Sequence, residues 1–242
     1  MGEGFRASCS QDFMKSSSAF ITPEGYPFIA YSSGLFLFLA VAAWLFSSVA
    51  LAVPAFITLL LTAFIISFFR NPERTPPSDT SLLVAPADGQ VVYVGPSSQQ
   101  HLGECQKISI FMSVFNVHVN RAPFSGKVLD YFYKPGRFYD ARHTKASSEN
   151  EQAGLVIETD QGDKIAFVQI AGLIARRIIC YAQVGDRLER GERYGLIRFG
   201  SRVDIYLPSD MLPLVTMGQM TTAGETPLAQ RGAGERQPKE CC

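Results

Sequence analysis

The feature that most constrains this chain is a long run without charge. From Leu35 to Phe69 the sequence contains no charged residue and consists mainly of Leu, Phe, Ala, Val and Ile. A helix crosses a bilayer with roughly 20 such residues, so this run is too long for one upright span and long enough for two short ones. Pro54 lies near the middle, and proline kinks a helix because it lacks a backbone donor. We therefore predict a helical hairpin over residues 34–70, either transmembrane or re-entrant, with its breakpoint at Pro54.

Basic residues flank both ends of this run, with Lys15 before it and Arg70 and Arg74 after it. An excess of Lys and Arg is typical of cytoplasmic flanks, so both ends of the hairpin are predicted to lie on the cytoplasmic side of the cell membrane. The alternative is a pair of buried helices in a soluble protein. Helices that line a core carry a polar face, and this run has none.

Downstream of the hairpin, short β-like runs alternate with Gly, Pro, Asp and Asn at intervals of about ten residues. This spacing favours a mainly β, antiparallel sandwich- or barrel-like domain over βαβ units. The runs are Leu82–Ala85, Gln90–Val94, Lys107–Met112, Gly126–Tyr133, Leu155–Glu158, Lys164–Ile170, Arg177–Tyr181, Tyr194–Arg198 and Val203–Leu207. The predicted organisation is a lead-in (1–33), the hairpin (34–70), a proline-rich linker (71–80), the β domain (81–220) and a flexible tail (221–242).

The segment 184–192 reads Val-Gly-Asp-x-Leu-x-x-Gly-Glu, which places two glycine turns around a short strand. It resembles the hairpins of lipoyl- and biotin-carrier domains and related barrel-sandwich folds. No lysine lies at a hairpin tip to carry a prosthetic group, so the carrier chemistry is not expected. One hypothesis for the chain is therefore a membrane-tethered barrel-sandwich adaptor that binds other proteins and performs no chemistry.

Composition excludes several classes of function. The 22 basic and 22 acidic residues balance, which argues against a nucleic-acid partner. The five cysteines form no CxxC pair, so neither a disulfide scaffold nor a zinc site is predicted. The chain also lacks the HxH pair and the HxxxD motif of a barrel-sandwich metallopeptidase, and no metal is expected.

The pair Gly200–Ser201 joins two predicted strands. A serine hydroxyl beside a glycine carbonyl can attack it, because glycine has no side chain to block the approach. Such a site could cut its own chain and leave a modified serine at the new N-terminus. The alternative is an ordinary tight turn, which both residue types favour.

Three further residues are candidates for chemistry, each with a structural alternative. His118 lies in a strand that runs into a turn, where a histidine is commonly a packed residue. His143 follows a loop rich in Gly, Arg and aromatic residues, and such loops often carry function. Asp88 lies in an Asp-Gly pair, which is typical of a hairpin turn. Its carboxylate could instead orient a histidine, as in nucleophile-activating triads.

Four segments occur together in a distinctive order: 85–89 (APADG), 115–126 (FNVHVNRAPFSG), 136–151 (GRFYDARHTKASSENE) and 199–201 (FGS). In this order, and behind a membrane anchor, they resemble the short, membrane-associated form of phosphatidylserine decarboxylase proenzymes. The resemblance covers residues 71–208, including the segment 171–177 (AGLIARR). It implies a lyase of phospholipid synthesis that acts on phosphatidylserine at the membrane.

The resemblance also implies a cofactor made from the chain. Ser201 attacks the Gly200 carbonyl, and elimination cuts the precursor into a β chain (1–200) and an α chain (201–242) that stay together, with further dimerisation left open. Ser201 becomes a covalent pyruvoyl group, derived from the serine and equivalent to a bound pyruvate. Its carbonyl forms a Schiff base with the substrate amine and acts as the electron sink for decarboxylation to phosphatidylethanolamine.

By the same resemblance, His118 is the base for this serine and Asp88 orients it. Many members carry a second histidine three residues later, where this chain has Arg121, which stays protonated and cannot act as the base. The base is therefore expected to be His118, with His143 as the reserve. An anionic substrate also calls for cationic groups, and the candidates are Arg137, Arg142, Lys145, Arg176 and Arg177. For each of these, ordinary surface charge is the alternative.

Overall fold

The computed structural model describes residues 19–143, 145–173, 177–198 and 200–231. Its helices are η1 (Pro23–Gly25), α2 (Tyr26–Leu45), α3 (Val49–Phe68) and α4 (Ala146–Glu149). Its strands are β1 (Leu83–Val84), β2 (Gly89–Gln99), β3 (Gly103–Met112), β4 (Val119–Arg121), β5 (Gly126–Lys134), β6 (Gln152–Glu158), β7 (Lys164–Ala171), β8 (Ile178–Cys180), β9 (Arg187–Leu188), β10 (Arg193–Ile197), β11 (Ser201–Pro208), β12 (Met211–Pro213), β13 (Met220–Thr221) and β14 (Pro227–Arg231). The prediction of a mainly β domain behind a helical hairpin is confirmed.

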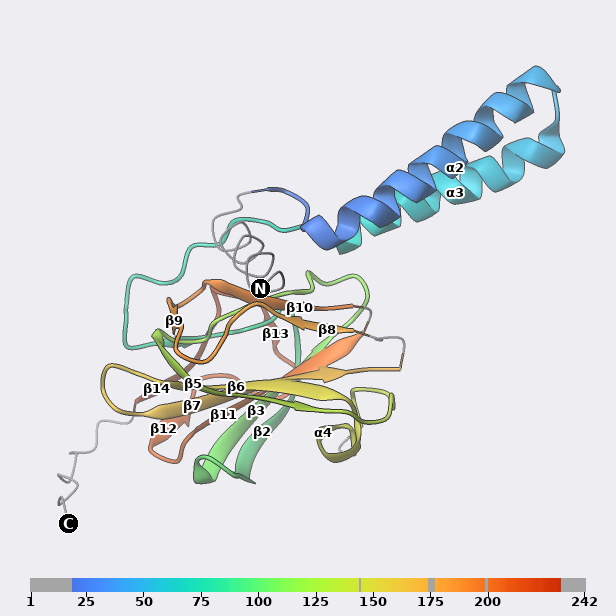
Figure 1. Ribbon diagram of the computed structural model, residues 1–242. Helices are drawn as coiled ribbons and strands as arrows, with labels where there is room; N and C mark the ends of the chain where they lie inside the picture. The colour runs from blue at the N-terminus through green and yellow to red at the C-terminus, as the bar shows by residue number, and fades with distance from the viewer. Residues whose placement is uncertain (1–18, 144, 174–176, 199, 232–242) are drawn as a thin grey trace, which may run out of the picture.

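The two long helices pack side by side and project from the β domain (Figure 1). The chain reverses at residues 46–48, where Ser47 has a φ of 49°. The predicted breakpoint at Pro54 is wrong, because Pro54 lies inside α3. At 1.5 Å per residue, a helix of 20 residues is about 30 Å long and matches the hydrocarbon core of a bilayer. A break at Pro54 would leave the second helix too short to span it.

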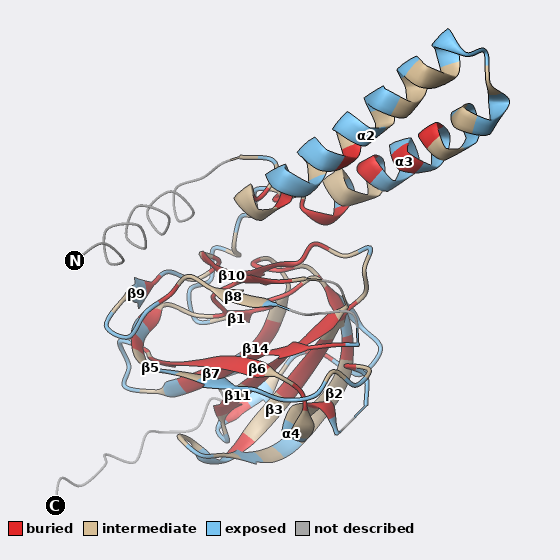
Figure 2. Ribbon diagram, turned by 45° about the vertical axis from the view of Figure 1, so that its right-hand side comes forward, coloured by how far each residue is buried: buried red, intermediate tan, exposed pale blue. Residues whose placement is uncertain are grey.

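Most of the surface of both helices is apolar and uncovered (Figure 2). Phe38, Trp44 and Phe56 are 70%, 78% and 60% exposed. Helices that are apolar on every side need an apolar solvent, which a soluble pair would find in a protein core. Here no described part of the chain covers them, so the hairpin associates with a membrane.

The base of the hairpin packs onto the β domain. Phe68 and Phe69, each 1% exposed, share a cluster with Val119 of β4 and Leu196 of β10. The Thr22 amide donates to the Phe69 carbonyl oxygen at 2.9 Å. The two helices therefore do not hang from a free tether: their base is part of the folded domain.

The β domain is built on one curled antiparallel sheet with the strand order β13-β2-β3-β11-β7-β6-β5-β9. Two smaller sheets, β1-β14-β12 and β4-β10-β8, lie against it (Figure 1). Each of the nine predicted β runs overlaps one of these strands. The predicted glycine turns at Gly185 and Gly191 are present with φ values of 96° and 82°.

The main core lies between the curled sheet and the two smaller sheets. Alternate residues of β11, namely Val203, Ile205 and Leu207, point into it and are fully buried. Because side chains alternate across a strand, the residues between them face the other side of the sheet. The apolar–polar alternation in the sequence therefore maps directly onto the two faces of this sheet.

Two segments are more ordered than their composition indicates. Residues 221–231, which the sequence assigns to a flexible tail, instead complete β13 and form β14, which pairs with β1 and β12. The tail residues 232–242 lie outside the described part of the chain. The proline-rich residues 71–82, here called the proline strap, are held along the domain by arginines from β4 and from the β9–β10 turn.

Arg190 makes the largest number of these contacts. Its guanidinium donates to the carbonyl oxygens of Pro77, Asp79 and Leu82 at 2.5–2.8 Å. We predict that Arg190→Met lowers the free energy of unfolding by about 2 kcal/mol, since three carbonyl groups, two of them in partly buried hydrogen bonds, would lose a charged donor. Denaturant unfolding of the full chain in detergent micelles measures this change.

Arg187→Met is the matched control. Arg187 lies on the same hairpin and forms an ion pair with Asp160 at 2.6 Å, but both side chains are more than half exposed. Exposed ion pairs contribute little to stability, so this variant should unfold like the parent. Equal unfolding curves for both variants would contradict a stabilising role for the strap contacts.

Candidate active site

Gly200 and Ser201 lie where the chain enters the centre of the curled sheet. Ser201 is the first residue of β11 and pairs with Met112 of β3 on one side and Ala171 of β7 on the other. Gly200 has a φ of 58°, in the left-handed region that favours glycine. The prediction of two strands that meet at this joint is confirmed, with β10 before it and β11 after it.

The carbonyl of Gly200 is packed tightly against the backbone of Gly172. A Cβ atom placed on Gly172 would lie 2.1 Å from the Gly200 oxygen. That distance is far below any van der Waals contact, so only glycine fits at position 172. The close approach fixes the position of the carbonyl that the serine would attack.

The hydroxyl of Ser201 is fully buried and has a weak partner. It donates to the Met112 sulfur at 3.5 Å, and Asn120 Nδ2 donates to the same sulfur at 3.6 Å. Gln169 Nε2 in turn donates to Asn120 Oδ1 at 2.8 Å. A thioether is a poor acceptor, so the hydroxyl loses little when it turns to another partner. Sequence reasoning missed Asn120 and Gln169, although an amide side chain inside an apolar strand was a signal for both.

His118 is a buried, neutral base. Its ring lies against Phe68 with centroids 4.1 Å apart, and Nδ1 is 2.9 Å from the Asn116 carbonyl oxygen. Because a carbonyl only accepts, Nδ1 carries the proton and Nε2 carries the lone pair. Nε2 is buried and has no hydrogen-bond partner among the residues that the structure describes. Burial, the largest effect, lowers the pKa of His118 to about 4, so the imidazole is unprotonated at pH 7.

Asp88 does not hydrogen-bond to His118. Its carboxylate accepts from Arg74 Nη2 at 3.1 Å and from the Ala223 amide at 2.8 Å. The partner that orients His118 is the Asn116 carbonyl instead. The structure therefore does not join the predicted Asp88–His118 pair directly, since Asp88 is engaged by the proline strap and by the turn after β13.

Arg121 occupies the position where many members of the resembling family carry a histidine. Its guanidinium donates to the carbonyl oxygens of Gly191 and Pro72, both at 2.8 Å. Burial lowers the pKa of Arg121 to about 10, so it stays charged at pH 7. Arg121 is thus a structural cation that fastens the proline strap.

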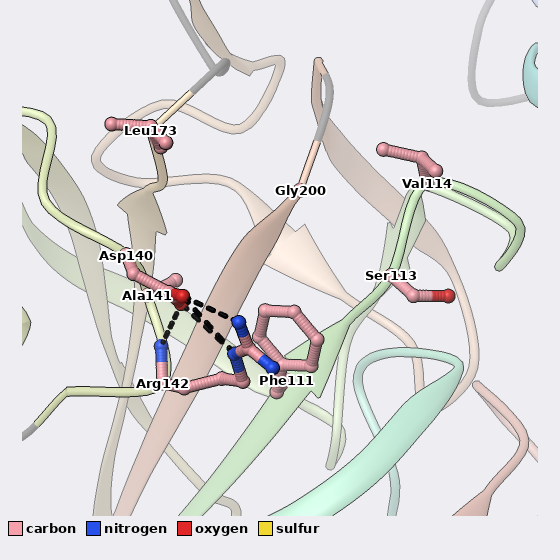
Figure 3. A pocket seen from close by; sticks show the side chains of 8 residues that line it. All are labelled: Phe111, Ser113, Val114, Asp140, Ala141, Arg142, Leu173 and Gly200. Carbon is pink, nitrogen blue, oxygen red and sulfur yellow. Dashed lines mark hydrogen bonds and ion pairs between the residues drawn. The ribbon is translucent and has the colours of Figure 1, made fainter.

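A cavity of about 350 Å³ opens at Gly200 (Figure 3). It is lined by Phe111, Ser113, Val114, Asp140, Ala141, Arg142, Leu173 and Gly200. An adjoining cavity of about 500 Å³ shares Asp140 and Leu173 and is lined further by Tyr139, His143 and Lys145. Of the predicted residues, Arg142 therefore lines the cavity at the Gly200–Ser201 joint, and His143 and Lys145 line the adjoining cavity.

Arg142 is the cation nearest this joint in the cavity lining. Its Nε and Nη2 donate to the carboxylate of Asp140, with a shortest distance of 2.6 Å, and its guanidinium lies 5.5 Å from the centre of the Phe111 ring. Hydrogen bonds from Arg142 lower the pKa of Asp140 to about 2. Nη1 of Arg142 is not used by Asp140.

Two other predicted cations, Arg137 and Arg177, lie outside both linings. Arg137 bonds to the Tyr139 hydroxyl at 2.5 Å and forms an ion pair with Glu149, and it lines neither cavity. Arg177 is exposed and also absent from the two linings. Arg176 lies outside the described residues.

Sequence reasoning also missed Arg202, which is 3% exposed and directly follows the serine. Its guanidinium donates to the carbonyl oxygens of Ala141 and His143 at 2.8 and 3.1 Å, and it pairs with Asp204 at 2.8 Å. Arg202 thus holds the cavity loop over the start of β11. A charged pair in alternation with core residues of β11 was the signal for this role.

Comparison with known proteins identifies the family to which this site belongs. The family model for phosphatidylserine decarboxylase matches residues 61–229, which include the joint and every described lining residue. A phosphatidylserine decarboxylase proenzyme of Trichlorobacter lovleyi is 74% identical over 90% of this chain and 100% of its own length. The proenzymes of Geobacter metallireducens and Geobacter sulfurreducens are 59% and 58% identical over 88% and 89% of this chain and 97% and 98% of theirs.

These matches favour the enzyme over the adaptor. The family model covers more than half of the chain, and the relatives align with it along almost their full lengths. The chain belongs to the phosphatidylserine decarboxylase family and is a proenzyme that decarboxylates phosphatidylserine with a serine-derived pyruvoyl group.

Proposed function

We propose that Ser201 is the serine that this proenzyme converts into its pyruvoyl group, and that cleavage falls between Gly200 and Ser201. The observation that carries this assignment is the local geometry. A left-handed glycine presents a carbonyl fixed against Gly172, and a buried serine follows it at a cavity. The chain is thereby divided into a β chain, residues 1–200, and an α chain, residues 201–242.

Maturation begins with the Ser201 hydroxyl. Its oxygen attacks the Gly200 carbonyl carbon, the peptide C–N bond breaks, and an ester replaces it, which frees the amine of residue 201. Elimination then breaks the Cβ–O bond and cuts the chain into a Gly200 carboxylate and a dehydroalanine at position 201. After tautomerisation, water replaces the nitrogen, which leaves as ammonia, and the pyruvoyl group remains. A serine hydroxyl needs a base to accept its proton. We assign this role to His118, supported by its neutral imidazole and its unpartnered Nε2 lone pair. His143 on the exposed cavity loop is the alternative base.

Position 201 suits an uncharged keto group. The Ser201 side chain is fully buried, and within the described part of the chain its hydroxyl bonds to the Met112 sulfur alone, so its conversion breaks no ion pair. Burial also keeps bulk water away from the group. When formed, the pyruvoyl group supplies the electron sink that decarboxylation requires. The residues around it bind and orient the substrate.

The cationic side of the cavity suits the two anions of the substrate. Arg142 keeps Nη1 for a carboxylate or phosphate while Asp140 holds the rest of its guanidinium. Lys145 lines the adjoining cavity and supplies a second positive charge. We assign headgroup binding to these two residues; contacts from Arg137, Arg176 and Arg177 remain sequence-based predictions.

The catalytic domain is assigned to the cytoplasmic side of the cell membrane. Arg70 and Arg74 follow α3 directly and lie on the side of the membrane that carries the β domain. A concentration of basic residues beside a span favours the cytoplasmic face. The phosphatidylserine headgroup would then be taken from the inner leaflet.

Ser201→Ala should leave one uncut and inactive chain, because the hydroxyl that starts cleavage is missing. Denaturing gel electrophoresis should show a single band, whereas the parent gives two, with a smaller fragment of 42 residues (242 − 200). Mass spectrometry of that fragment reports both the cut position and its cap. Ser209→Ala, an exposed serine in the turn after β11, should cleave normally. Decarboxylation by Ser201→Ala would overturn the assignment.

His118→Phe should slow self-cleavage by about 10²- to 10⁴-fold, the usual contribution of a positioned base. Phenylalanine keeps the apolar contact with Phe68, so the domain should still fold, which a thermal unfolding curve checks. His143→Ala is the matched comparison and should cleave at the parental rate. If His118→Phe cleaved normally and His143→Ala did not, the base would be His143.

Gly172→Ala should slow cleavage at least tenfold, because the new Cβ would lie 2.1 Å from the Gly200 oxygen and displace the carbonyl under attack. A tenfold loss corresponds to about 1.4 kcal/mol in the barrier. Gly95→Ala is the control, since a Cβ there meets only the flexible side chain of Tyr93, with the hydroxyl nearest at 3.1 Å. A time course of fragment appearance measures both, and parental kinetics in Gly172→Ala would contradict the role of this close contact.

A further inference from the structure

One exposed aromatic ring beside the cavity has no role in the chemistry above. Phe115 is 74% exposed at the tip of residues 113–118, which connect β3 to β4 and are here called the aromatic loop. A large apolar side chain at a loop tip favours a partner that removes it from water. Among the described residues, its ring has one aromatic neighbour: it meets the ring of Phe64 at 82° with centroids 6.3 Å apart.

The aromatic loop is held in shape and fastened to the hairpin. The backbone amide and the hydroxyl of Ser113 both donate to Asn116 Oδ1 at 2.8 Å. In return, the backbone amide of Asn116 donates to the Ser113 carbonyl oxygen at 3.0 Å. Arg70, just past the end of α3, donates to the Phe115 carbonyl oxygen at 2.8 Å. The ring is thus presented on a fixed turn at the base of the helices.

The position of Phe64 sets the depth of this ring. Phe64 lies four residues before the end of α3 at Phe68, which is about 6 Å along the helix axis. Because α3 matches the thickness of the hydrocarbon core, Phe64 lies inside the boundary of the bilayer. A ring in contact with Phe64 therefore reaches the same layer, and Arg70 lies at the level of the headgroups.

The aromatic loop also forms one rim of the active-site cavity. Ser113 and Val114 line it, and Leu173, which is 70% exposed, lies across Gly200 from Val114 (Figure 3). With a volume of about 350 Å³, the cavity is at the lower end of the range for small-ligand sites. It has room for a polar headgroup, and two long acyl chains must remain outside it.

We propose that the aromatic loop inserts Phe115 into the membrane beside the hairpin and so places the cavity mouth at the headgroup layer. The partner of this surface is the lipid bilayer, because the ring continues the apolar surface of α3 and is bordered by Arg70. The substrate enters sideways from the membrane plane, with its acyl chains left in the lipid. This inference rests on the decarboxylase function only for the route of the substrate.

A fluorescent reporter at position 115 tests the insertion. In a Trp44→Phe background, which removes the only tryptophan of the chain, Phe115→Trp provides the reporter and Leu212→Trp the matched control. Leu212 is 52% exposed on β12, which pairs with β14. Arg231 at the end of β14 forms an ion pair with Asp163, just before β7 begins, whereas the cavity lies beyond Ala171, where β7 ends. Both full-length proteins are reconstituted into phosphatidylcholine vesicles whose acyl chains carry bromine at a shallow position.

Insertion predicts that bromolipid quenches the reporter at position 115 and that aqueous iodide does not, with the opposite result at position 212. Quenching by iodide at both positions would overturn the proposal. Protection from iodide without quenching by bromolipid would also overturn it, since the ring would then be covered by protein, such as a second copy of the chain. Neither readout depends on catalytic activity, so failure here is distinguishable from failure of the proposed site.

Activity then tests the substrate route. Phe115→Ser should lower kcat/KM for long-chain phosphatidylserine in vesicles by about tenfold, the factor for losing roughly half of the burial of a phenylalanine side chain. With a short-chain phosphatidylserine dissolved as monomers, the same variant should react like the parent, and Leu212→Ser should match the parent with both substrates. An equal loss with both substrates would show that Phe115 supports the site itself rather than access from the bilayer.

Discussion

The rest of the structure depends on how firmly β11 is held. It pairs with β3 from Ser201 to Pro208 and with β7 from Ser201 to Tyr206, so from its first residue onward the strand lies between two partner strands. The chain beyond it returns as β14, between β1 and β12. A cut before Ser201 therefore releases no sheet edge, and the two products stay joined by the ladders and the core. A proenzyme can break its backbone at the centre of its fold because the strand is held by pairing with β3 and β7 and not by the peptide bond that is cut.

Much of this fold could be predicted from local pattern. Alternation with period two marks strands with one face in a core, and the length of a charge-free run marks a pair of spans. The position of the turn in the hairpin could not be predicted, because the cost of Pro54 within α3 is outweighed by the need for two helices of bilayer length. Residues 227–231 carry no strong strand pattern, and they become a strand only because β1 and β12 lie on either side. Contacts between distant segments decided the features that local pattern missed.

The site shows the same division. The Gly200–Ser201 joint and the cavity loop with Arg142 and His143 could be located from ordered motifs, since these motifs keep their sequence together in the fold. The direction in which each side chain points could not be predicted in this way. Asn120 and Arg121 are neighbours on β4, and alternation sends them to opposite sides: Asn120 toward the Met112 sulfur and Ser201, Arg121 toward the proline strap. The predicted pairing of Asp88 with His118 fails as a direct bond for a similar reason, since motif order says nothing about which side chains meet.

The hairpin contributes more to the enzyme than attachment. The ring of Phe68, the last residue of α3, lies against the imidazole of His118 and belongs to a cluster with Phe69 and Val119. This contact contributes to the burial of the imidazole, and burial is the main cause that keeps it unprotonated at neutral pH. Removal of the hairpin would expose the ring to water and return its pKa toward the ordinary value of about 6.5. The anchor that brings the domain to its lipid substrate thus also sets the protonation of the histidine assigned to maturation, so membrane attachment and activation are built on the same contact.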